Sequence, residues 1–376
     1  MWTLCIYTMP VEFVQEDGDR LLFTIKGVDV STANAIRRVI ISEIPTVVFK
    51  SHSHDEETIS IKINTTRLNN EILKQRIGCI PIHICDIADR SFEDLEAIIS
   101  KKNTTTSIQY VTTEDITVRN TKTGKDLTRE STKKMFPPDK KTGDYVIICR
   151  LRPKISDDID GEELDLKATM SLGTAKEDGM YNVASTCLYT FSADEVKQNA
   201  AWSKRAKELE LENEEEIEQE KRNWYLLEGK RIYKQNSFDF IIETVGVFTS
   251  LSLVVKACQI VIQKLRDCST AVGNGQNAIT LSKTTMKNAF DVRLENEDYT
   301  LGNVLQNVLH RRYYEGQQGL SYLGFKKFHP HDTHSTIRLA LRDSEFGADR
   351  VKEYVTKSCT EGMQIFEKLI TELAPS

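Results

Sequence analysis

The residue types best suited to chemistry gather in a histidine-rich segment near the C-terminal end of the chain. His329, His331 and His334 lie close together, with Asp332 among them. Imidazole and carboxylate groups are common zinc ligands, so the types of these side chains match those of a zinc site. Pro330, however, interrupts their spacing. We therefore predict no metal ion here and keep a zinc site as the alternative interpretation.

Two other groups of polar residues give weaker indications of metal or nucleic-acid binding. His52 and His54 can share one face of an extended segment, but no third ligand lies nearby in the sequence, which favours a solvated loop. A basic cluster flanks Pro137-Pro138 and could contact nucleic acid, although a solvated loop is again the stronger interpretation. Its lysines are Lys133, Lys134, Lys140 and Lys141.

The sequence lacks the motifs of the common catalytic sites. It has no phosphate-binding P-loop, no nucleophile elbow and no glycine-rich dinucleotide-binding turn after a strand. Neighbouring carboxylates fall in polar turns where hydration is their natural state, and no aspartate cluster suits catalytic magnesium. These carboxylates are Asp157, Asp158, Asp160, Glu162 and Glu163. We predict a chain without catalytic residues, cofactor or metal.

The composition is that of an acidic globular chain long enough for two or three domains. Its 376 residues include 50 Lys and Arg against 56 Asp and Glu, and the net charge of -6 disfavours nucleic-acid binding as the main task. No two of the eight cysteines have zinc-ribbon or redox-motif spacing. The N-terminal segment is a poor signal peptide, and no apolar run suits a membrane span. We expect a reduced protein of the cytoplasm or nucleus.

The first element that must position functional side chains is a short helix. Ser31 and Thr32 can cap its start, and Pro45 must end it because proline has no amide hydrogen. Its apolar residues recur at steps of three and four, which places them on one stripe. They are Ala35, Ile36, Val39, Ile40 and Ile44. Arg37 and Arg38 lie beside this stripe.

The rest of the chain combines strands and helices, which predicts an α+β protein. Strands are predicted over residues 21–30, 46–49, 108–112, 116–119, 145–151, 238–244 and 290–294. Helices are predicted from Asn69 or Asn70 to Gly78, after Ser192 or Asp194, over about 251–266, from Thr300, and at the C-terminal end. Eight glutamates between Glu208 and Glu220 favour a solvated helix, and Gly273-Asn274-Gly275 indicates a linker.

An internal repeat relates the two ends of the chain. Ser31-Thr32-Ala33-Asn34 aligns with Thr300-Leu301-Gly302-Asn303, and each segment follows a strand and precedes an apolar stripe. A C-terminal helix of about 28 residues also carries an apolar stripe. Its residues are Ala348, Val351, Val355, Cys359, Met363, Phe366, Ile370 and Leu373.

These segments carry a resemblance to the alpha-type subunits of multisubunit RNA polymerases. Asn34–Pro45, NAIRRVIISEIP, resembles their assembly helix, and Asn64–Ile82 resembles the NTT…RLGLIP signature of the third-subunit branch. Tyr145–Leu151 and Gly173–Lys176 resemble the next strand and loop of that branch, but Asp178–Tyr181 departs from it. In the second half, Glu295–Asn303 and the segments around Tyr322–Phe325 and His329-Pro330 resemble the eleventh subunit.

The resemblance implies two alpha-subunit-type dimerisation modules in one chain, with a mainly β insert domain in the first. The implied boundaries are 1–48 with 184–270 for the third-subunit-like module, 49–183 for the insert, 271–286 for a linker and 287–376 for the eleventh-subunit-like module. Many relatives hold zinc or an iron–sulfur cluster in the insert. Residues 87–148 contain no cysteine, so no metal is expected there.

The resemblance also implies the role of particular residues in a non-catalytic assembly platform. Docking of the second-largest subunit is expected to use Arg37, Arg38, Glu43 and Arg76. Pairing of the two modules is expected to use Ile36, Val39, Ile40, Val254, Ile260, Leu301, Val304, Leu305, Val308, Val355 and Phe366.

Implied partners are the second-largest and largest polymerase subunits and small zinc-binding accessory subunits, with little direct contact to DNA and no membrane. Single-chain fusions of this kind resemble those of large DNA viruses, which implies the host cytoplasm, its viral factories and the virion, or the nucleus for a cellular protein. Two alternatives remain open: a stand-alone metal- or nucleic-acid-binding protein, and a homodimeric adaptor outside transcription.

Overall fold

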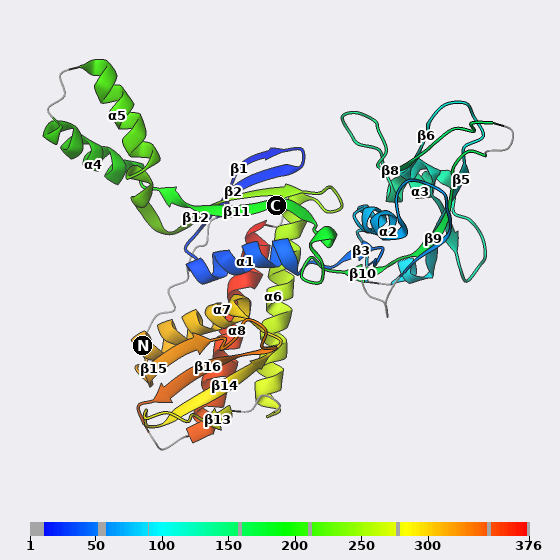
Figure 1. Ribbon diagram of the computed structural model, residues 1–376. Coiled ribbons are helices and arrows are strands. Elements are labelled where there is room, and N and C mark those ends of the chain that lie inside the picture. Colours follow the sequence, from blue (N-terminus) through cyan, green and yellow to red (C-terminus); the bar gives the residue numbers. More distant parts are fainter. Residues whose placement is uncertain are drawn as a thin grey trace. The chain divides into compact units, whose positions relative to one another are not determined.

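The computed structural model (Figure 1) describes residues 11–51, 58–88, 90–156, 160–209, 213–275, 279–343 and 347–373. The chain forms two compact units. Unit 1 comprises Met1–Ile40, Thr186–Glu243 and Val254–Ser376, and unit 2 comprises Ile41–Ser185 and Thr244–Leu253. Both combine helices and sheets, as the sequence predicts. None of the helices built from the described residues has the length and hydropathy to cross a bilayer.

The first sheet of unit 1 is antiparallel and has the strand order β1-β2-β12-β11. Its strands are β1 (Val11–Asp17), β2 (Arg20–Lys26), β11 (Ala184–Ala193) and β12 (Tyr233–Thr244). Phe23 lies opposite Phe240 in the β2–β12 register, and their rings stack with centroids 5.2 Å apart. The β2–β12 pairing thereby joins segments far apart in the sequence.

That helix, α1 (Val30–Ser42), follows β2 and buries the predicted stripe, including Ile36, Val39 and Ile40. Its cap differs from the prediction. The amide of Ser31 donates to Oδ1 of Asp29 at 2.8 Å, so Asp29 caps the helix in place of the two expected hydroxyl residues. A carboxylate at the cap also complements the positive end of the helix dipole.

The second sheet of unit 1 is antiparallel and has the order β13-β14-β16-β15. Its strands are β13 (Ile279–Leu281), β14 (Ala289–Glu295), β15 (Leu320–Lys326) and β16 (His334–Leu341). The helical elements that accompany it are α7 (Tyr299–Leu309), the π-helix η5 (His310–Gly316) and α8 (Gly347–Leu373). α7 packs against α8 and β15.

The segment between the two sheets differs from the predicted linker. Helix α6 (Ser250–Gly273) continues well past the expected end near residue 266, since Val272 is buried and stabilises the last turn. Strand β13 also lies within the stretch 271–286, where Ile279 pairs with Val292 of β14. A three-residue strand has too short a pattern to be recognised without its partner.

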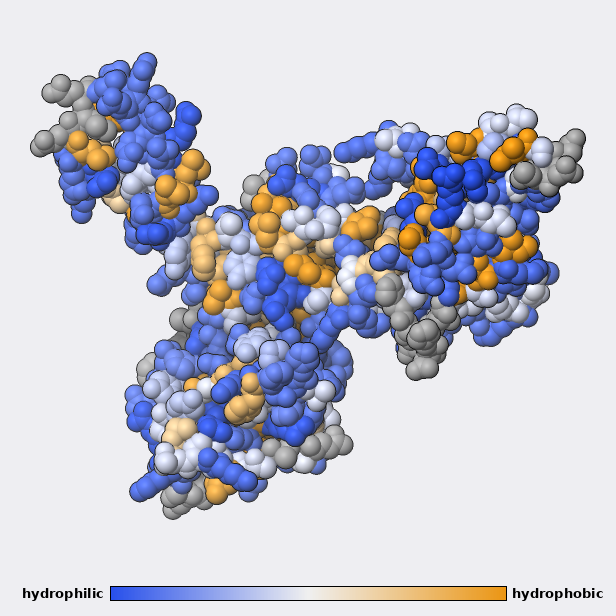
Figure 2. All heavy atoms as spheres, viewed as in Figure 1, coloured by the Kyte–Doolittle hydropathy of each residue, from blue (hydrophilic) through white to orange (hydrophobic). Residues whose placement is uncertain are grey.

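Two helices of unit 1 connect β11 to β12. They are α4 (Glu195–Glu208) and α5 (Glu214–Leu226), followed by the 3-10 turn η4 (Gly229–Arg231). Asp194 caps α4 as predicted, and the rings of Trp202 and Trp224 join the two helices with centroids 5.7 Å apart. The glutamates that begin α5 are exposed, and Figure 2 shows a mostly hydrophilic surface over both helices.

Unit 2 is mainly β. One sheet has the order β4-β9-β5-β7, with β4 (Ile59–Asn64), β5 (Leu95–Lys102), β7 (Thr117–Asn120) and β9 (Glu163–Thr169). Two-stranded sheets pair β6 (Gln109–Thr112) with β8 (Ile147–Leu151), and β3 (Thr46–Val48) with β10 (Ser171–Gly173). The helices are α2 (Asn70–Gly78) and α3 (Arg129–Met135), with 3-10 turns η1 (Ser91–Asp94), η2 (Thr113–Asp115) and η3 (Gly179–Tyr181).

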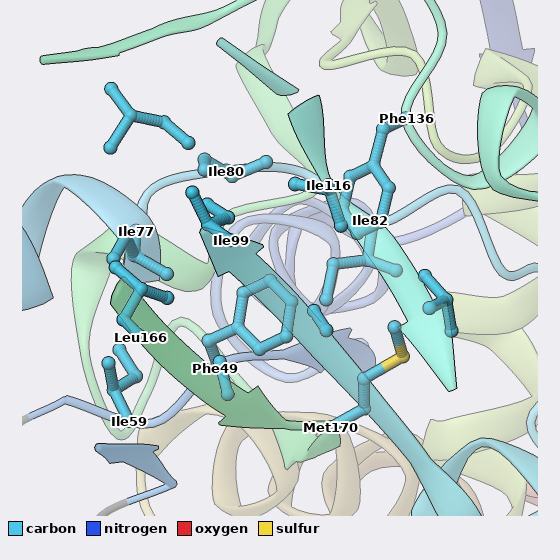
Figure 3. Packing of buried hydrophobic residues seen from close by; sticks show 14 of the residues in the cluster. Phe49, Ile59, Ile77, Ile80, Ile82, Ile99, Ile116, Phe136, Leu166 and Met170 are labelled. Carbon is cyan, nitrogen blue, oxygen red and sulfur yellow. The ribbon is translucent and has the colours of Figure 1, made fainter. Parts of the chain in front are cut away.

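The core of unit 2 collects apolar side chains from its sheets and helices (Figure 3). Phe49 and Phe136, far apart in the sequence, stack with ring centroids 6.3 Å apart. Ile77 of α2 and Leu166 of β9 belong to the same buried cluster. Burial of this apolar surface provides the main stabilisation of the unit.

Candidate subunit interface

Arg38 of α1 connects the first half of unit 1 to the start of α7. Its Nε donates to Oγ1 of Thr300 at 2.7 Å, and a terminal guanidinium nitrogen donates to Oδ2 of Asp298 at 2.8 Å. Asp298 also caps α7, because its Oδ1 accepts the amide of Thr300 at 2.8 Å. One carboxylate therefore satisfies both the helix end and the arginine, and it neutralises the cation near the positive end of the helix dipole.

The long helices α6 and α8 also contact each other. A hydrogen bond with Cys268 of α6 and burial both raise the pKa of the Cys359 thiol in α8. A Cβ atom added to Gly362 of α8 would lie 3.0 Å from Cδ1 of Leu265. The absence of a side chain at Gly362 thus permits the close approach of the two helices.

An ion pair supports the same contact region. Nζ of Lys264 in α6 lies 3.1 Å from Oε2 of Glu297, which precedes α7. The two side chains are only 18% and 17% exposed. Screening by solvent is therefore weaker than at an open surface pair, and the contact adds specificity to the apolar packing.

The apolar residues predicted to pair the two modules are nearly all buried. Those buried are Ile36, Val39, Ile40, Val254, Leu301, Val304, Leu305, Val308, Val355 and Phe366. Ile260 is only partly buried. The buried stripe of α6 passes instead through Val261 and Leu265, because residues three and four apart share one helix face.

The four residues predicted to dock a partner occupy different environments. Arg37 donates through Nε and a terminal nitrogen to Oδ1 of Asn34 on its own helix, at 3.1 and 2.9 Å. Arg38 makes the contacts with α7 described above. Glu43 follows α1 directly and belongs to unit 2. Arg76 donates to the carbonyl oxygens of residues 147 and 148, at 2.7 Å each.

Sequence reasoning missed Asp298, Glu297 and Lys264. A signal for Asp298 was present, because Asp29-Val30-Ser31 and Asp298-Tyr299-Thr300 share an aspartate two residues before a hydroxyl residue. The predicted repeat alignment places these two aspartates opposite each other, and both cap their helices. No sequence pattern indicated the Lys264–Glu297 pair.

The metal and carboxylate candidates have other contacts. Oδ2 of Asp332 accepts the amide of His329 at 2.9 Å, and Nδ1 of His329 accepts the amide of His331 at 3.1 Å. No cluster with metal-binding geometry occurs among the described residues. Asp160 pairs with Lys102, and Glu162 pairs with Arg152. The remaining candidates outside the described residues are His52, His54, Asp157 and Asp158.

The sequence matches one protein family over more than half of the chain. The family model of the RNA polymerase Rpb3/Rpb11 dimerisation domain matches residues 22–265. The chain therefore belongs to this family, and the resemblance to alpha-type polymerase subunits is confirmed at the level of the family.

The individual proteins to which the chain is similar are named as RNA polymerase subunits. The chain is 27% identical over 186 residues to DNA-directed RNA polymerase subunit Rpo3 of Methanosphaera stadtmanae, covering 49% of this chain and 61% of the relative. It is 30% identical over 192 residues to subunit 3 of RNA polymerases II, IV and V of Arabidopsis thaliana, covering 47% and 54%. It is 23% identical over 311 residues to RNA polymerase II subunit rpb3 of Dictyostelium discoideum, covering 70% of this chain and 95% of the relative. The chain thus spans less than two thirds of the archaeal and plant relatives.

Proposed function

We propose that the chain is a non-catalytic assembly subunit of a multisubunit DNA-directed RNA polymerase. Family membership over residues 22–265 supports this role, as do relatives named as polymerase subunits. The proposal assigns nucleotidyl transfer to other subunits.

In this proposal the chain is an intramolecular heterodimer of a third-subunit-like and an eleventh-subunit-like module. The observation that carries it is the contact of α1 and α6 with α7 and α8 through Arg38–Asp298 and Leu265–Gly362. The repeated aspartate caps of α1 and α7 support a common origin of the modules. A short connection between them gives an effective concentration on the order of millimolar, so the pair assembles without a bimolecular step.

The proposed partners are the second-largest and largest polymerase subunits, together with small zinc-binding accessory subunits. Arg37 and Glu43 are the proposed direct contacts with the second-largest subunit. Arg38 and Arg76 contribute to this docking indirectly, by holding the surrounding backbone elements in place. Both side chains bond within their own units. A single-chain arrangement further favours a polymerase of a large DNA virus, acting in the host cytoplasm and packaged in the virion.

The docking step is tested by charge reversal of Arg37 alone. Arg38 is a poor target, because a glutamate introduced at its position would face Asp298 and disturb the contact between the modules. Arg37→Glu is expected to abolish co-purification with the second-largest subunit while the circular dichroism spectrum stays unchanged.

Arg266→Glu provides a matched control. Arg266 also donates to a side-chain amide oxygen on its own helix, Oε1 of Gln263, at 3.0 Å. Capture of the second-largest subunit should survive this reversal. Undiminished capture by Arg37→Glu would contradict the docking role, and recovery of the native protein without any large polymerase subunit would contradict the assembly role.

A further inference from the structure

Unit 2 contains a groove of about 680 Å³ whose lining includes Arg76 and its backbone acceptors on β8. It lies over the β6–β8 ribbon and is bounded by the segment that leads into α2 and by α2 itself. Figure 2 shows hydrophobic and strongly hydrophilic residues side by side over this part of the unit. The mixture distinguishes the groove from an ordinary solvated surface.

The apolar part of the groove is exposed. Ile108, Tyr110 and Ile147 are 54%, 49% and 47% exposed. Tyr110 pairs with Arg150 across the ribbon, so the two side chains share one face of the sheet. Large side chains with this much apolar area in water favour a binding partner that covers them.

Cations surround these apolar residues. Arg76 and Arg152 are held in place, the first by backbone carbonyl groups and the second by Glu162. Arg67 and Arg150 are exposed, and neither side chain bonds to any group among the residues that the structure describes. Two guanidinium groups are therefore available to carboxylates of a partner.

The edges of the ribbon are partly closed to strand addition. Arg76 occupies the carbonyl oxygens of Ile147 and Ile148 on β8, and Nζ of Lys101 occupies the carbonyl oxygen of Tyr110 on β6 at 2.8 Å. Blocked edge carbonyls disfavour a partner that joins the sheet by main-chain hydrogen bonds. A partner must then bind through side chains across the face.

We propose that this groove binds an acidic segment of a partner protein in which aliphatic residues alternate with carboxylates. Charge complementarity carries the choice: four arginines line the groove against one glutamate, whose carboxylate is already paired with Arg152. Single-stranded nucleic acid fits less well, because it requires successive stacking surfaces and Tyr110 is the one aromatic residue lining the groove among those described. The proposal stands independently of the docking role of Arg37.

Fluorescence anisotropy on the full chain tests the groove. The probe is a short fluorescein-labelled peptide that alternates Glu with Leu and Ile, and the comparison probes are an Asp-Ser peptide, a Lys-Leu peptide and oligothymidine. The Glu-Leu-Ile peptide should bind best. Arg67→Glu with Arg150→Glu should weaken its binding about tenfold or more, since two partly exposed ion pairs are lost and reversed.

The matched control reverses Lys125 and Lys141, which are exposed in the same unit but do not line the groove. This control should bind the peptide as the unaltered chain does. Tyr110→Ser should weaken binding without any change of charge. Equal binding by the Arg67/Arg150 variant, preference for oligothymidine, or no binding of the acidic-aliphatic peptide would each overturn the proposal. Thermal unfolding of every variant shows whether a loss reflects the groove or the fold.

Discussion

Replacing Arg38 with alanine removes the polar connection between α1 and the start of α7. The guanidinium group loses its bonds to Thr300 and Asp298, at 2.7 and 2.8 Å. Asp298→Asn is the partner change, because asparagine still caps a helix while it gives up the negative charge. The two single variants and the double variant form a cycle that isolates the coupling of the two side chains.

The expected loss of unfolding free energy follows from the geometry and the solvent exposure of the two side chains. A hydrogen bond to a charged group contributes about 1.5–3 kcal/mol when it is well shielded. The Arg38 side chain is 36% exposed and that of Asp298 is 24% exposed, so solvent screening reduces the value. We expect a coupling of about 1 kcal/mol and a total loss of about 1–2 kcal/mol for Arg38→Ala.

Urea unfolding followed by circular dichroism measures these free energies for the four proteins of the cycle. Arg266→Ala serves as the control, because Arg266 bonds only within α6 through Gln263 in the described structure. Arg266→Ala should change the free energy of unfolding by no more than about 0.5 kcal/mol. A coupling near zero, or an equal loss at Arg266, would refute the claim that Arg38 stabilises α7.

Three other predictions concern packing, acid stability and metal content. Gly362→Val should lower the free energy of unfolding by about 1–3 kcal/mol because α8 would be overpacked against α6, whereas Gly273→Ala, with open space at its Cβ, should be nearly neutral in urea unfolding. A hydrogen bond from Arg338 holds the pKa of Asp291 below its usual value. This stabilisation is therefore present above the unfolded-state pKa near 4 and is lost as the pH falls through the folded-state pKa. The stability gap between the unaltered chain and Asp291→Asn should close on acidification, and a constant gap in unfolding curves from pH 6 to pH 3 would contradict this. Purified protein should contain well under one zinc per chain by elemental analysis, and stoichiometric zinc lost in His331→Ala would support the metal-binding alternative.

The sequence was sufficient to predict the elements that have clear local patterns. The caps of α2 at Asn69 and of α4 at Asp194 occur as predicted. The stripe of α1 is buried as predicted, except that Ile44 lies just beyond the end of the helix. Each of these signals is local, because a helix face or cap depends on residues within a few positions of one another.

Features that depend on the partner of a segment were missed or misplaced. Strand β13 is too short to be recognised alone, and its place is fixed by pairing with β14. The sequence suggested Ile260 as an interface residue because α6 is apolar on nearly every side, whereas packing selects a neighbouring stripe. The contact of Arg38 with Asp298 was not foreseen, because it joins residues far apart in the sequence.

In the proposed heterodimer, the two halves of the chain pair with each other through α6 and α8. A protease site inserted after Gly275 would allow the purified chain to be cut between these halves, and size-exclusion chromatography would then report whether they separate. We predict that the two fragments elute together at micromolar concentration and separate only in denaturant. Elution of two separate folded fragments in native buffer would contradict this pairing.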